Sequence, residues 1–136
     1  IFGIKIGYKV LLWTRDHVPL TQNVVVATDK TLRQSPDRVK RMIKGSIDGL
    51  RFIAERKEET IEIASKWLKL DAATTRAALD NYLPSYSPDG TLTDEAVRAL
   101  IQYELERVKS NQEVPLSQVA ERALLRQAQK ELHLIR

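Results

Sequence analysis

Hydrophobic residues recur at helical spacing through most of the chain after Asp29. The clearest stripe follows Ser35-Pro36-Asp37, which has the pattern of an N-cap, a proline at the first helical position and an acidic residue in the first turn. Its apolar members are Val39, Met42, Ile43, Ile47, Leu50, Ile53 and Ala54. This spacing places them on one face of a helix, so it predicts one long amphipathic helix.

More helical segments lie on either side, and most have an apolar stripe or a capping signal. They comprise a short turn at Lys30 to Gln34, then Glu58 to Leu68, Ala72 to Leu83, the residues after Thr93 up to about Val108, and Pro115 to about Leu132. Asp71 and Thr93 precede two of them and are expected N-caps, because their side-chain oxygens can accept from first-turn N–H groups. The run Ser87-Pro88-Asp89-Gly90 predicts a turn in the loop between these two helices.

Two short apolar runs precede the helical part and have a different pattern. Lys9 to Thr14 and Asn23 to Thr28 are rich in valine and leucine and do not alternate with polar residues. Such runs are typical of strands buried on both faces. A polar connector with a proline, Arg15 to Gln22, separates them. The order of two short strands and then about five helices predicts an α/β fold.

The predicted sheet is smaller than a sheet usually is, since sheets commonly have about 4–6 strands. The chain also opens on Ile1-Phe2-Gly3-Ile4, with neither an initiator methionine nor a signal peptide. Together these features lead us to expect a segment of a longer protein, whose further strands lie outside this sequence.

Composition narrows the classes of function. A chain of 136 residues with 43% hydrophobic and 29% charged residues is typical of one globular domain. The net charge of +4 is small and acidic residues lie among the basic ones, so no nucleic-acid partner is expected. There are no cysteines, which excludes disulfides and thiolate metal sites. No apolar run approaches the roughly 20 residues of a membrane span.

The sequence predicts a protein that is not an enzyme and that holds no metal or cofactor. Its two histidines, His17 and His133, are far apart, and no nucleophile, P-loop, dinucleotide or zinc-protease motif is present. His133, near the end of the chain, is expected to be solvated. His17 lies in the connector, where either a ligand contact or a solvated position is open.

Three side chains beside the first predicted strand are the best local candidates for ligand contact. Trp13, Arg15 and His17 alternate with Thr14 and Asp16 where the chain leaves that strand, and ligands of α/β folds commonly bind at carboxyl ends of strands. Trp13 could stack on a ring or fill the core. Arg15 could bind an anion or form a structural ion pair.

The segment NVVVATDKTLRQSPDRVKRMIKG, from Asn23 to Gly45, carries a family resemblance. An "ATD"-like step leads into a short turn, and a P-D-x-V-K pattern then opens a long helix. Later pieces agree in order and spacing: Gly49 to Ile53, Glu58 to Ile61, Leu83 to Gly90 and Leu92 to Glu95. The chain resembles the C-terminal portion of the periplasmic solute-binding proteins that serve ABC importers, in the nitrate/sulfonate/taurine and thiamine-pyrimidine-precursor group. The resemblance extends from about Val10 to Leu134.

This resemblance implies part of a type II periplasmic-binding-protein fold. Residues 1–28 would form hinge strands (Val10–Trp13 and Val24–Ala27) and a connector bordering the cleft, and residues 29–136 the helical part of the first lobe. The cleft border would include Trp13, Arg15, His17, Thr21 and Gln22. The implied function is capture of a small anionic or heteroaromatic solute between two lobes. The implied partners are that solute, an ABC permease and the missing N-terminal portion. The implied location is periplasmic, or extracellular with a lipid anchor.

Two other functions stay open. The same fold serves as a sensor or as an enzyme of pyrimidine-precursor synthesis, and fused signalling sequence or an upstream catalytic histidine-rich segment would distinguish these from transport. The chain could also be an independent helical interaction module. Cooperative unfolding without any stabilisation by solute would favour that third reading.

Overall fold

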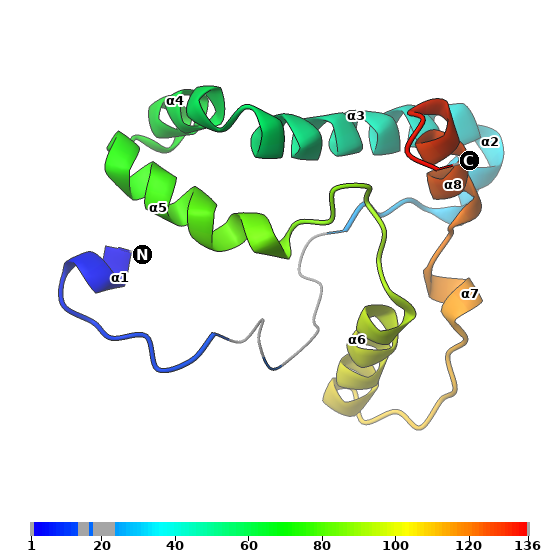
Figure 1. Cartoon of the computed structure of the whole chain (residues 1–136). Coiled ribbons are helices and arrows are strands. Elements are labelled where there is room, and N and C mark those ends of the chain that lie inside the picture. The colour runs from blue at the N-terminus through cyan, green and yellow to red at the C-terminus, as the bar shows by residue number, and fades with distance from the viewer. Residues whose placement is uncertain (1, 14–16, 18–23, 136) are drawn as a thin grey trace.

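The computed structural model describes residues 2–13, 17 and 24–135 (Figure 1). Of these residues, 66% lie in helices and none lies in a strand. The helices are α1 (Phe2–Lys5), α2 (Asp29–Gln34), α3 (Pro36–Glu55), α4 (Lys57–Leu68), α5 (Ala72–Tyr82), the 3-10 helix η2 (Leu83–Ser85), α6 (Asp94–Arg107), α7 (Leu116–Val119) and α8 (Ala123–Glu131). The described part of the chain is therefore all-α.

The predicted α/β fold, and with it the part of a type II periplasmic-binding-protein fold, is wrong for this part of the chain. Val10–Trp13 and Val24–Ala27 lie in segments without secondary structure instead of in strands. A strand is stable only when a neighbouring strand pairs with its backbone groups, and neither segment has a described strand to pair with. Their side chains lie in solvent as well: Leu11 is 94% exposed and Val26 82%. The division of the chain at residue 28 stays a prediction.

The helix starts and N-caps that the sequence predicts are confirmed, in contrast to the strands. Helix α3 has Ser35 at its N-cap and Pro36 in its first turn. Asp71 Oδ1 accepts from the Thr74 amide at 2.8 Å and caps α5. Thr93 Oγ1 accepts from the amide of the third residue of α6 at 3.1 Å. The side chains of Asp71 and Thr93 thus satisfy amides that have no partner within their own helix, whereas Ser35 occupies the N-cap position of α3 without a side-chain hydrogen bond to the helix.

The predicted last helix is wrong in one respect, because it is broken in two. Helix α7 ends at Val119 and α8 begins at Ala123. Ala120 between them has extended backbone angles, with φ −119° and ψ 101°. The break lets α8 leave the direction of α7 and pack on α3.

Three helices end on a residue in the left-handed conformation that is not glycine. Lys69, Lys109 and His133 follow α4, α6 and α8 with φ of 54°, 52° and 58°. In each case the next amide bonds back to a carbonyl five residues earlier: Leu70 to Ser65 at 3.1 Å, Ser110 to Leu105 at 2.9 Å and Leu134 to Gln129 at 2.9 Å. This is the hydrogen bond of a Schellman motif, which satisfies the last carbonyls of a helix. The two lysines also place positive charge at the negative helix end.

The centre of the core lies where α3, α8 and the loop at residues 86–92 meet. Ile47 of α3 is 1% exposed, and Ala128 of α8 is fully buried. Gly90 in the loop has φ +76°, and a Cβ there would lie 3.3 Å from Ile47 Cγ1 and 3.4 Å from Leu125 Cδ1. Glycine fits both the backbone angle and the narrow space, so the loop can lie close against both helices.

A buried amide fastens this loop to α8. Gln129 is 4% exposed, and its Nε2 donates to the Asp89 carbonyl at 2.9 Å and to Thr91 Oγ1 at 3.0 Å. The Asp89 carboxylate in turn accepts from the Thr91 amide and the Ser87 hydroxyl. Burial raises the pKa of Asp89, but these hydrogen bonds outweigh it and hold the pKa below its ordinary value. The predicted turn at residues 87–90 is thus confirmed as a structural element.

Two lysines of α3 hold the end of α8. Lys40 Nζ lies 2.7 Å from Glu131 Oε1 and Lys44 Nζ lies 3.0 Å from Glu131 Oε2. Their hydrogen bonds hold the pKa of Glu131 below its ordinary value. Both lysines belong to the polar flank of α3, so a surface contact adds to the apolar contact beneath it.

The lowered pKa of Glu131 predicts a contribution to stability that depends on pH. The unfolded chain binds a proton at the ordinary pKa, so the contribution is present above that pKa and is lost as pH falls through the lower folded value. We expect Glu131→Gln to have a lower urea midpoint than the parent at about pH 7 and an equal one at about pH 3. Glu113→Gln, at an exposed residue outside the helices, is the control and should match the parent at both pH values. An equal deficit for Glu131→Gln at both pH values would contradict the assignment.

Candidate functional site

The structure describes two of the five candidate ligand residues of the sequence, Trp13 and His17. Trp13 ends the described segment at residues 8–13 and is about one-third exposed, and His17 is exposed. Arg15, Thr21 and Gln22 lie outside the described residues. Neither Trp13 nor His17 lines either of the two cavities described below. Their contact with a solute therefore stays a prediction.

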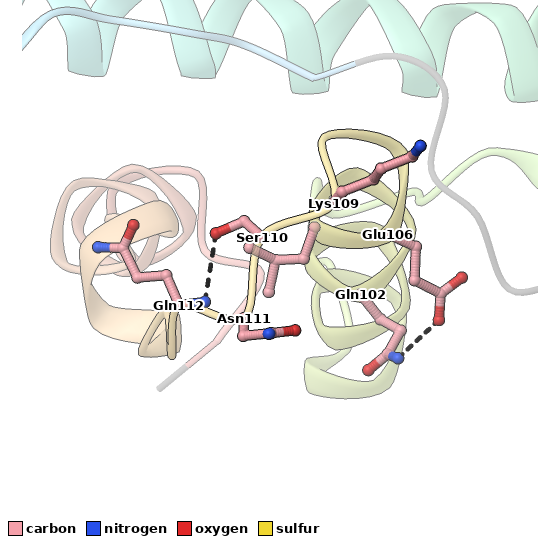
Figure 2. Close-up of a pocket in the computed structure, with 7 residues that line it drawn as sticks. Gln102, Glu106, Lys109, Ser110, Asn111 and Gln112 are labelled. Carbon is pink, nitrogen blue, oxygen red and sulfur yellow. Dashed lines mark hydrogen bonds between the residues drawn. The ribbon is translucent and has the colours of Figure 1, made fainter.

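A cavity of about 380 Å³ lies at the C-terminal end of α6 (Figure 2). Its lining residues come from the last two turns of the helix and from the segment that follows: Gln102, Leu105, Glu106, Lys109, Ser110, Asn111 and Gln112. The left-handed backbone of Lys109 reverses the chain at this point. The hydrogen bond from the Ser110 amide to the Leu105 carbonyl then holds the following residues beside the helix. The cavity thus forms because α6 ends here and the chain turns back beside it.

Several polar groups of this cavity already bond to one another. Gln102 Nε2 donates to Glu106 Oε1 at 2.7 Å, and the Gln112 amide donates to Ser110 Oγ at 3.2 Å (Figure 2). A neighbouring cavity of about 500 Å³ shares Gln102 and extends toward the start of α6 along Glu95, Arg98 and Ala99. Both are open to solvent along one side of the helix.

The residues of the first cavity can recognise a polar molecule but are poorly arranged for a reaction. They supply one ammonium group, one carboxylate, side-chain amides and a hydroxyl. A serine nucleophile needs a base within hydrogen-bond reach, and Ser110 Oγ instead accepts a hydrogen bond from the backbone amide of Gln112. Histidine and cysteine are absent from the seven lining residues. These groups can form hydrogen bonds to a polar solute.

Within the described residues, no three or more histidine, cysteine, aspartate or glutamate side chains gather where they could hold a metal ion. Searched over the same ranges, none of the helices combines the length and apolar character that crossing a membrane requires.

Sequence reasoning did not find the cavity at the end of α6. Its only signal in the sequence is the polar run from Ser110 to Glu113, which marks a break between helices but indicates no binding. The cavity depends on the left-handed turn at Lys109. A lysine in that conformation is uncommon, because the Cβ atom of any residue other than glycine destabilises it, so the pattern of residue types does not predict the turn.

Comparison of the chain with protein-family models, with curated proteins and with solved structures gave no match.

Proposed function

We propose that this chain acts as part of the solute-binding component of an ABC importer, which captures a small anionic or heteroaromatic solute. The proposal starts from the order of motifs between Asn23 and Glu95. Several of these motifs are helix starts: α3 opens at Pro36 and α6 at Asp94, each after its cap. The helical residues from 29 onward would act as scaffold. The solute would bind beside Trp13 and Arg15.

The observation that carries the proposal is the exposed apolar character of the segments before α2. Exposed large hydrophobic side chains fill both described stretches: Ile4, Ile6, Tyr8, Val10, Leu11, Leu12, Trp13, Val24, Val25 and Val26. Covering apolar surface stabilises a protein by about 25 cal/mol per Å². Contiguous exposed apolar surface commonly marks a contact with another protein part. A binding protein whose remaining portion covers these exposed side chains at residues 4–13 and 24–26 would account for it.

In this proposal the mechanism is reversible capture without any covalent step. Closure of two lobes around the solute would select the bound state, and the closed form would dock on a permease in the membrane. The solute-facing residues would be Trp13, Arg15, His17, Thr21 and Gln22. The location would be periplasmic, or extracellular with a lipid anchor.

Thermal unfolding of the full-length gene product that contains this chain tests the proposal. We expect one member of a panel of nitrate, taurine, an alkanesulfonate and an aminopyrimidine to raise the melting temperature in a saturable way, with about 2.7 kcal/mol of stabilisation at a hundredfold excess over Kd. If the solute is an anion, Arg15→Gln should weaken its binding. If the solute is a heteroaromatic ring, Trp13→Ala should weaken its binding. His133→Ala, at the far end of the chain, is the control. No shift with any member would contradict the proposal.

A helical interaction module is the second candidate, and the all-α character of the described residues favours it. The core formed by α3, α8 and the loop at residues 86–92 contains its own buried polar contacts. A module of this kind should unfold in one cooperative transition as the isolated 136-residue chain. A solute-binding segment that needs its missing portion should instead unfold broadly and bind a hydrophobic dye at its exposed apolar segments. Urea unfolding followed by circular dichroism distinguishes the two.

A further inference from the structure

We draw no further inference here: the strongest candidate, the exposed apolar surface of α4 at Ile63 and Trp67, carries none, because nothing in the described part of the structure shows what covers it.

Discussion

Replacement of Ile47 by alanine is expected to lower the free energy of unfolding by about 3–4 kcal/mol, the largest effect of any single change considered for this chain. Ile47 is 1% exposed and is the largest fully buried side chain among the described residues. It also lies against Gly90, so its removal leaves a cavity beneath the loop at residues 86–92 as well as between α3 and α8. Few other buried apolar side chains share the core, so the neighbours can fill little of that space.

Urea unfolding followed by circular dichroism measures this loss. Met42→Ala is the matched control, because Met42 lies on the same helix, belongs to the same predicted stripe and is exposed. Its change should stay within about 0.5 kcal/mol, since it removes little buried surface. Equal losses for the two variants would mean that α3 contributes through its surface and not through the contact at Ile47.

Replacement of Gln129 by glutamate is expected to lower the free energy of unfolding by about 2–4 kcal/mol at neutral pH. The change keeps the shape of the side chain but removes the amide that donates to the Asp89 carbonyl and Thr91 Oγ1. It also places a carboxylate in a nearly buried position beside a carbonyl oxygen. The carboxylate and the Asp89 carbonyl oxygen then repel one another, and the carbonyl loses the donor that Gln129 supplied.

The pH dependence of this variant separates loss of the hydrogen bond from loss of packing. Burial beside an acceptor should raise the pKa of the new carboxyl in the folded state above its unfolded value. The deficit is therefore present above that raised pKa and disappears as pH falls below the unfolded value, because the protonated acid can donate to Asp89. Gln127→Glu, at an exposed position of α8, should show little deficit at any pH. A deficit at residue 129 that does not change with pH would contradict the assigned bond.

The helices were predictable from the sequence because their signals are local. Asp71 and Thr93 cap α5 and α6 with their own side chains. The turn before α6 forms at Asp89 and Gly90 through contacts between residues close in the chain. Caps and turns of this kind act within about four residues, so residue type and spacing are enough to predict them.

The two predicted strands could not be established from local signals in the way that the helices could. Val10–Trp13 and Val24–Ala27 have the composition of strands, but a strand exists only where a second strand satisfies its backbone. The candidate ligand residues depended on that sheet, so the prediction that Trp13 and His17 border a cleft has no support from the described structure. The cavity beside α6 was missed for the opposite reason, because the left-handed turn at Lys109 goes against the preference of its residue type.

The sequence by itself determined where the main helices begin, which apolar stripe α3 carries and where the chain turns at Gly90. Only the tertiary structure decided that Gln129 is a core residue, that Glu131 joins α8 to α3 and that Trp67 of α4 lies in solvent. The physical reason is the range of the interactions. Caps and periodicity depend on neighbours in the chain, whereas burial depends on which distant helix covers a face. Apolar residues at helical spacing therefore form a core around Ile47 in α3 and lie in solvent at Trp67 in α4.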